Sequence, residues 1–307
     1  NLNYKKTNKF STLLNISGSF MQSEKLIFKN LSILDKENKI KISNIFFDKD
    51  SLLIDLSEAN FDYIDTENKL NLFALRKEDQ NNFKLNGLFF NANTIVTYLL
   101  KNKENKENEL MKNNINILLN INEVYLDDIN FIKNLQGSVV IADNKIIDAS
   151  LSANFASNNN IIFTINTKDD EKITKLYSSK AKPLVYRYKF IKGFDEGYLD
   201  FKSTKKGDKS ISNLKIYDFK LKELPALTKL LTLASLQGIA DTLTGEGIRF
   251  DEFEMNFNNK GNLMTIDEIY AIGPAISILI NGYIEENKLI SLRGTLVPAT
   301  TINKTIS

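Results

Sequence analysis

The segment that decides the fold is a β-hairpin near the end of the sequence. Its first strand reads Ala275-Ile276-Ser277-Ile278-Leu279-Ile280-Asn281-Gly282-Tyr283-Ile284 and leads to the turn Glu285-Glu286-Asn287-Lys288. The chain then returns through Leu289-Ile290-Ser291-Leu292-Arg293-Gly294-Thr295-Leu296-Val297. Two apolar runs rich in β-branched residues and joined by a short polar turn are typical of an antiparallel hairpin.

A strand with strict alternation comes just before this hairpin. Phe253, Met255 and Phe257 are separated by single polar residues, and the predicted turn 258–261 leads into a further strand at 263–266. Because side chains two apart in a strand point to the same side of a sheet, the pattern predicts one apolar and one wet face.

The same pattern recurs in the first half of the chain. Runs at 16–20 and 26–28, at 42–47 and 52–54, and at 137–141 and 146–151 are each separated by a short polar turn. Short strands at this spacing are typical of an antiparallel meander. We therefore predict a mainly β protein, an elongated antiparallel β-sheet of repeating hairpins, with a few short helices.

Three segments depart from the β pattern. Residues 93–100 read as a short helix with Asn93 as N-cap, and residues 182–191 as a second, with Pro183 in its first turn. Residues 225–244 read as a third helix, with Pro225 in the first turn and Gly245 at its end. Because most of its circumference is apolar, we expect this third helix to be buried on most sides or to lie in an apolar medium.

The composition excludes several kinds of chemistry. The chain has 307 residues, a net charge of +2, and no His, Cys or Trp. Without His or Cys it offers no Ser-His-Asp triad, thiolate nucleophile or ordinary zinc site. A net charge near zero argues against nucleic-acid binding. We therefore expect no enzyme activity, no cofactor and no metal.

The motifs that remain are weak. Carboxylate pairs occur at 127–128, 169–170, 267–268 and 285–286, and we read them as solvated turns or strand edges rather than a glycosidase pair. Residues 48–50 and 195–197 lack the ligand pattern of a calcium loop. Gly245-Glu246-Gly247 reads as a helix stop, and the basic cluster at 180–192 as a solvated helix face or a contact for anionic headgroups.

One region of the sequence resembles a known family. Residues 214–303 resemble the AsmA-like C-terminal domain, in particular the YhdP-type branch of the AsmA/TamB superfamily. The stretches that carry the resemblance are 216–221, 224–227, 230–239 with Asp241, 245–250, 261–263, 272–274 and 294–299. Upstream of 214 the match rests only on the hairpin pattern and on residues 178–197.

The resemblance implies a periplasmic, bridge-like protein. Family members have an N-terminal inner-membrane helix and a long sheet curled into an apolar groove (a β-taco) that passes phospholipid between the inner and outer membrane. We accordingly expect phospholipid or another acyl lipid as ligand, an inner-membrane anchor absent from this chain, and outer-membrane or envelope proteins as possible partners. The alternative is an envelope assembly or scaffolding protein that acts by partner binding.

The expected organisation follows from these patterns. Residues 1–100 form a first groove segment, 101–114 a polar linker, 115–213 a continuation, and 214–307 the AsmA-like domain. The candidate groove-lining residues are Phe253, Met255, Phe257, Ile276, Ile278 and Ile280. The candidates on the helix that caps the groove are Leu227, Leu230, Leu231, Ala234, Leu236 and Leu243.

Overall fold

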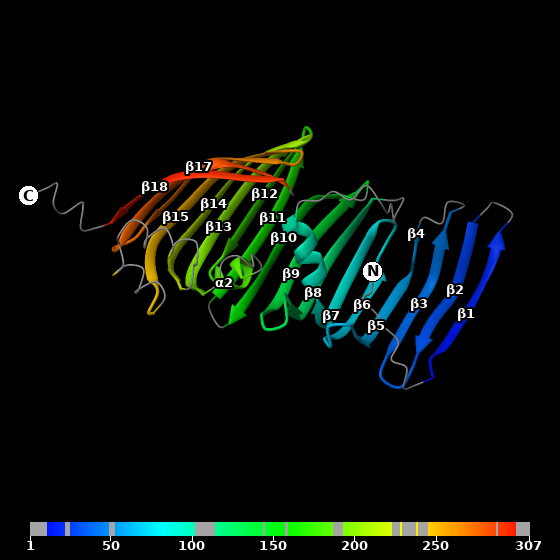
Figure 1. Cartoon of the computed structure of the whole chain (residues 1–307). Coiled ribbons are helices and arrows are strands. Elements are labelled where there is room, and N and C mark those ends of the chain that lie inside the picture. Colours follow the sequence, from blue (N-terminus) through cyan, green and yellow to red (C-terminus); the bar gives the residue numbers. More distant parts are fainter. Residues whose placement is uncertain are drawn as a thin grey trace, which may run out of the picture. The chain divides into compact units, whose positions relative to one another are not determined.

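The computed structural model describes residues 11–298 except 22–24, 49–52, 102–113, 144, 157–158, 187–192, 223–227, 229–237, 239–244 and 287. Within these residues the chain is mainly β, with eighteen strands and two short helices (Figure 1). The chain divides into two compact units, residues 1–158 and 159–307, which we call unit 1 and unit 2.

Unit 1 contains ten of the described strands. They are β1 (Leu13–Met21), β2 (Lys25–Leu34), β3 (Lys39–Phe47), β4 (Leu53–Asp55), β5 (Glu58–Ile64), β6 (Leu70–Lys77), β7 (Asn82–Asn91), β8 (Ile115–Tyr125), β9 (Phe131–Ala142) and β10 (Lys145–Ala156). Antiparallel pairs join β1 to β2, β2 to β3, β5 to β6, β6 to β7, β8 to β9 and β9 to β10, and β3 also pairs antiparallel with both the short β4 and β5. The predicted hairpins at 16–28, 42–54 and 137–151 are confirmed.

One pair in unit 1 departs from the predicted meander. β7 and β8 are parallel, so the prediction of antiparallel pairing throughout was wrong here. The long connection between them includes helix α1 (Asn93–Lys101), and a parallel pair needs such a crossover because the chain must return to the strand's starting end. The predicted linker 101–114 lies outside the described residues, apart from Lys101 and Asn114.

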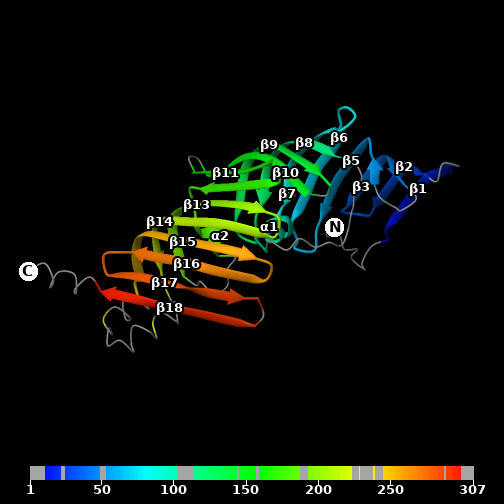
Figure 2. The same cartoon turned by 90° about the horizontal axis from the view of Figure 1, so that it is seen from above.

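Unit 2 is an antiparallel meander over its described strands. These are β11 (Asn159–Lys168), β12 (Glu171–Ser178), β13 (Phe194–Lys206), β14 (Lys209–Leu221), β15 (Ile248–Lys260), β16 (Leu263–Ile272), β17 (Ile276–Glu285) and β18 (Leu289–Pro298). Each pairs with the next in sequence, and Figure 2 shows β13 to β18 side by side in this order. The hairpin predicted at 275–297 is confirmed as β17–β18.

The helices agree only partly with prediction. The helix at 93–100 is confirmed as α1, but Asn93 is its first residue rather than its N-cap, because the first helical bond runs from Val96 N to Ala92 O. By that bond Ala92 is the N-cap residue, and the side chain of Asn91 just before it accepts a hydrogen bond from Asn93 N at 3.0 Å through Oδ1. Helix α2 (Lys182–Val185) has Pro183 in its first turn, as predicted, but ends before Tyr186.

The predicted apolar helix at 225–244 lies outside the described residues. Within that range the structure describes only Thr228 and Gly238, both in helical conformation. The predicted turn at 258–261 is shorter than expected, since β15 continues to Lys260 and Gly261 takes a left-handed φ of 57°. The predicted division into residues 1–100, 101–114, 115–213 and 214–307 stays a prediction. Its boundary at residue 214 falls within β14.

The core of unit 1 lies on one face of its sheet. Ile40, Ala59, Phe61 and Phe83 are buried in it, and the ring of Phe61 stacks on that of Phe73 at 4.5 Å between centroids. Hairpin turns of the form Asp-x-x-Asn brace the strand ends. In one of them the Asp127 carboxylate accepts the backbone N–H groups of Ile129 and Asn130, at 2.9 and 2.7 Å.

Candidate functional site

One face of the unit 2 sheet is apolar across all eight of its described strands. Directly paired residues point to the same side of a sheet, so the registers define rows of side chains that cross the strands. The first row is Ile161, Ser178, Leu199, Ile216, Phe253, Ala271, Ile278 and Leu296. The second row is Phe163, Leu176, Phe201, Leu214, Met255, Ile269, Ile280 and Gly294.

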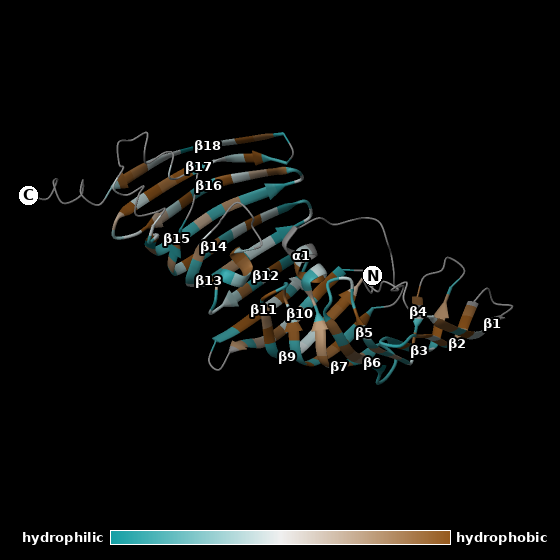
Figure 3. Cartoon of the chain, turned by 60° about the horizontal axis from the view of Figure 1, so that its bottom comes forward, coloured by the Kyte–Doolittle hydropathy of each residue, from teal (hydrophilic) through white to brown (hydrophobic). Residues whose placement is uncertain are grey.

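We call the side that carries these rows the apolar face. With neighbouring strands ~4.8 Å apart, eight strands give it a span of about 34 Å. In Figure 3, hydrophobic and hydrophilic residues alternate along the strands of unit 2, as two different faces require. The apolar side chains therefore form a continuous strip that runs across the strands.

The structure brings the six predicted lining residues together on this face. Phe253 and Ile278 both pair with Ala271, and Met255 and Ile280 both pair with Ile269. Five of the six are half-buried, whereas Ile276 is completely buried near one end. The half-buried side chains keep apolar area available, among the described residues, for a molecule that lies on the strip.

One end of the apolar face is closed by α2. Ala181, Leu184 and Val185 pack into the same core as Phe250 and Ile276. Below them the rings of Phe194, Phe219 and Phe250 stack in series, with 5.3 Å between successive centroids and interplanar angles of 14° and 12°. Phe253 meets Phe219 edge-on at 6.4 Å, so it joins this capped core to the rest of the strip.

Two local backbone features bring the stacked rings onto this side. Glu196 and Asp218, on neighbouring strands, both have left-handed φ values, of 62° and 53°. Strict alternation would place Phe194 and Phe219 on the opposite side from Leu199 and Ile216, yet all four lie in one core. These two left-handed residues lie at the same level of β13 and β14 and change the alternation, while the two strands stay paired without a register shift.

The opposite face is polar over β13 to β15. Glu254 accepts hydrogen bonds from Asn213 Nδ2 at 2.6 Å and from the Tyr270 hydroxyl at 2.5 Å, and it forms a 3.0 Å ion pair with Lys215. Burial raises the pKa of the Glu254 carboxyl, but the hydrogen bonds from Tyr270, Lys215 and Asn213 outweigh it and bring the pKa to about 2. The hydrogen bond to Glu254, together with burial, raises the pKa of Tyr270.

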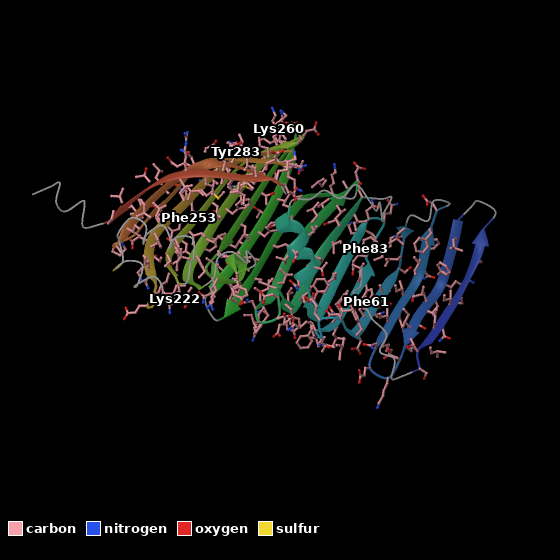
Figure 4. All side chains as sticks on the ribbon, in the orientation of Figure 1. Phe61, Phe83, Lys222, Phe253, Lys260 and Tyr283 are labelled. Carbon is pink, nitrogen blue, oxygen red and sulfur yellow. The ribbon has the colours of Figure 1, made fainter. Side chains whose placement is uncertain are left out.

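The apolar face changes character toward the hairpin end that carries Lys260 (Figure 4). On β12 to β14 its third and fourth rows hold hydroxyl and ammonium groups. We call these residues the hydroxyl–lysine patch: Lys172, Thr174, Ser203, Lys205, Ser210 and Ser212. The same two rows on β15 to β18 are mostly apolar: Phe257, Ile266, Leu292, Met264, Ile284 and Ile290. Sequence reasoning missed this patch, because it appears only when the rows are aligned.

The other predicted residues lie elsewhere. Asp127-Asp128 and Asp169-Asp170 are in turns, as expected, whereas Asp267 and Glu268 are exposed within β16, at a register shift. In the predicted basic cluster, Lys182 pairs with Asp195 at 2.9 Å, and Tyr186 is exposed. The six candidate residues on the capping helix, from Leu227 to Leu243, lie outside the described residues.

Comparisons with known proteins identify no relative. No protein-family model, no curated protein and no solved structure matches the chain. Among the described residues, no group of three or more acidic side chains is arranged to hold a metal ion. None of the described helices has the length and hydropathy needed to cross a bilayer.

Proposed function

We propose that the protein carries phospholipid, or another acyl lipid, on the apolar face of unit 2. The observation that carries this proposal is the second row of the apolar face, which is apolar and half-buried on seven successive strands from Phe163 on β11 to Ile280 on β17. A passive carrier needs a sheltered apolar path and no nucleophile, base or metal. Moving an acyl chain through water costs about 0.8 kcal/mol for each CH₂ group, and contact with such a face removes part of that cost.

The sequence resemblance supplies the biological setting of the proposal. As in the AsmA/TamB superfamily and its YhdP-type branch, we place the protein in the periplasm of a Gram-negative cell envelope. An inner-membrane anchor would belong to the full-length protein, and the lipid would pass between the inner and outer membrane during outer-membrane biogenesis. In this proposal the apolar face is the lining of a β-groove, and the segment 225–244 is its capping helix.

A second candidate is an envelope assembly or scaffolding protein that acts through partner binding. Its supporting observation is β18, which pairs with β17 and, among the described residues, with no other strand. Its side chains Ile290 and Leu292 are exposed, and exposed apolar edge strands favour pairing with another chain. In this alternative the apolar face is a closed core and binds no lipid.

Substitutions at two adjacent residues of β17 distinguish lipid carriage from the scaffolding function. Ile278 lies on the apolar face, while Leu279 lies on the opposite face and is 46% exposed. We expect Ile278→Asp to reduce the extraction of a fluorescent phospholipid from vesicles at least tenfold, because a carboxylate interrupts the apolar path. Leu279→Asp and Ser277→Asp, on the same strand but the other face, should stay within twofold of wild type.

Circular dichroism and urea unfolding of each variant provide the folding control. Wild-type extraction by a folded Ile278→Asp variant would contradict lipid carriage. If Ile278→Asp and the milder Ile280→Thr both unfold the protein, the apolar face is a closed core and the scaffolding candidate stands.

A further inference from the structure

Strand β18 ends the described part of the unit 2 sheet. It pairs with β17 along its whole length without a register shift, and among the described residues it pairs with no other strand. An edge strand of this kind presents a row of backbone N–H and C=O groups that can pair with a further strand. Natural sheets protect such an edge with lysines, prolines, a bulge or a very short strand.

β18 has little of this protection. It is ten residues long, its only charged side chain is Arg293, and its only proline is Pro298 at the end. Residues 289–295 are all exposed, and Ile290 and Leu292 are 67% and 47% exposed. The strand therefore combines an open backbone edge with uncovered apolar side chains, which favours pairing with another strand.

The sequence of β18 is symmetric in character about one residue. The stretch Leu292-Arg293-Gly294-Thr295-Leu296 reads in both directions as leucine, polar residue, glycine, polar residue, leucine. A twofold-symmetric dimer needs a self-complementary surface of this kind, because the same segment of each copy meets the other. The strand that fits the edge of β18 is therefore β18 of a second copy.

The register of such a pair follows from geometry and charge. Residues directly opposite in an antiparallel pair lie on the same face, so a twofold axis between two copies of β18 must pass through one residue. Two positions of the axis keep nearly the whole strand paired. An axis at Arg293 places two arginines face to face, which is unfavourable. An axis at Gly294 places Arg293 opposite Thr295 of the second copy. It also places Leu292 opposite Leu296 of the second copy, on the apolar face.

The first strand of unit 1 is a less suitable partner for β18. Among the described residues β1 pairs only with β2, and its register shifts between Ser17 and Gly18. An irregularity of this kind bends and twists an edge strand and so hinders further pairing. Pairing of β18 with β1 of the next copy would also build an open-ended chain of copies, whereas two β18 strands form a closed dimer.

A dimer of this kind joins the apolar faces of two copies. Because the axis is perpendicular to the sheet, both apolar faces lie on the same side. Gly294 ends the second row of the apolar face, so the second rows of the two copies meet at the axis. The exposed side chain of Leu292 is then covered by Leu296 of the second copy, at two symmetric positions.

We propose that the protein forms a twofold-symmetric dimer in which β18 pairs antiparallel with β18 of a second copy, with the axis at Gly294. The dimer carries one apolar strip that is twice as long as that of a single copy. The pairing depends on the edge strand and not on lipid, so it goes beyond the proposed function and is tested independently of it.

Size-exclusion chromatography with light scattering measures the assembly of the full chain. We expect a mass twice the 35.0 kDa of one chain. Thr295 is exposed, and Thr295→Lys places a lysine opposite Arg293 of the second copy at two symmetric positions. This variant should raise the dissociation constant of the dimer at least tenfold. The double variant Arg293→Glu/Thr295→Lys makes these contacts attractive and should return the dissociation constant to within threefold of wild type.

The chain offers a matched control away from the edge. Thr265 on β16 is exposed and shares a row with Tyr283 and Ser291, so it lies on the same face as Thr295. Thr265→Lys makes the same change of residue and charge two strands from the edge. It should leave the dissociation constant of the dimer unchanged.

Introduced cysteines test the register. The chain has no Cys, so the introduced thiols are the only ones present. Arg293→Cys and Thr295→Cys chains, when mixed and oxidised, should form a disulfide between copies, because directly opposite Cβ atoms lie about 5 Å apart. Either variant alone places its two thiols on a diagonal, about 7–8 Å apart at Cα, and should crosslink at least fivefold less.

Several results would overturn the β18 dimer. They are a wild-type monomer, a chain of copies that lengthens with concentration, and a dimer that Thr295→Lys leaves intact or that Thr265→Lys weakens equally. Lipid extraction from the same samples tests the proposed function separately. A lipid-free dimer would contradict lipid carriage and leave the β18 pairing in place, whereas a lipid-bound monomer would do the reverse.

Discussion

The two faces of the unit 2 sheet are built from the same strands, but one face is apolar and the other is polar over β13 to β15. On β15, Phe253, Met255 and Phe257 form part of the apolar strip, while Glu254 between them is held by Tyr270, Lys215 and Asn213. Every polar group of this network has a partner on its own face, whereas the apolar strip beyond α2 is only half-buried. The opposite face is therefore complete in itself, and the apolar face is the one that has area left for a ligand.

The largest expected difference between the faces is in stability. Phe219 is buried between the rings of Phe194 and Phe250, so Phe219→Ala should lower the free energy of unfolding by about 3–5 kcal/mol. Tyr217, two residues away, stacks on the half-exposed Tyr198 on the other face. Urea unfolding should show a loss of less than about 1.5 kcal/mol for Tyr217→Ala. Equal losses would contradict the assignment of the core to one side.

The polar face should respond to acid. The pKa of Glu254 is lowered from 4.5 to about 2, so the ionised carboxylate stabilises the fold above the unfolded-state pKa. That stabilisation is lost as the pH falls from about 4.5 through 2. The urea midpoint of wild type should therefore decrease over this window, and Glu254→Gln should decrease less steeply. If the urea midpoint of Glu254→Gln depends on pH in the same way as that of wild type, the Glu254 carboxylate contributes little to stability.

The smallest effect is expected at an exposed ion pair. Arg249 Nη2 and Glu196 Oε2 are 2.5 Å apart, and both side chains are about half exposed. Exposed pairs contribute only ~0–1 kcal/mol, because solvent screens them and ordering the side chains costs entropy. Arg249→Met should thus leave the urea midpoint almost unchanged. A loss above about 2 kcal/mol in the free energy of unfolding would show that Arg249 helps to hold the left-handed backbone of Glu196.

Much of the strand pattern follows from local sequence. The alternation at 253–257 and the apolar run at 276–280 predict strands, because a period of two is a local property. That Phe253 and Ile278 share a row depends on the register through Ala271, which depends on pairing between strands. The hydroxyl–lysine patch combines residues of three strands and could not be recognised before those registers were known.

Other features could not be predicted because they depend on the backbone conformation of single residues or on the path of a long connection. Ordinary alternation assigns Phe194 and Phe219 to the wrong face, because nothing in the sequence marks Glu196 and Asp218 as left-handed. Asn44 and Asn134 adopt left-handed φ values inside strands, which Asn tolerates better than most residues, and no local pattern predicted these two positions. The parallel β7–β8 pair depends on how a long connection returns, which no short pattern encodes.

The most direct test of the account is native mass spectrometry of the purified full chain, with lipid extraction from the same sample. Lipid carriage on the apolar face predicts co-purifying phospholipid, and Ile278→Asp should lose it while Leu279→Asp retains it. A wild-type protein that is folded and free of lipid, and that takes up none from added phospholipid, would contradict the central claim.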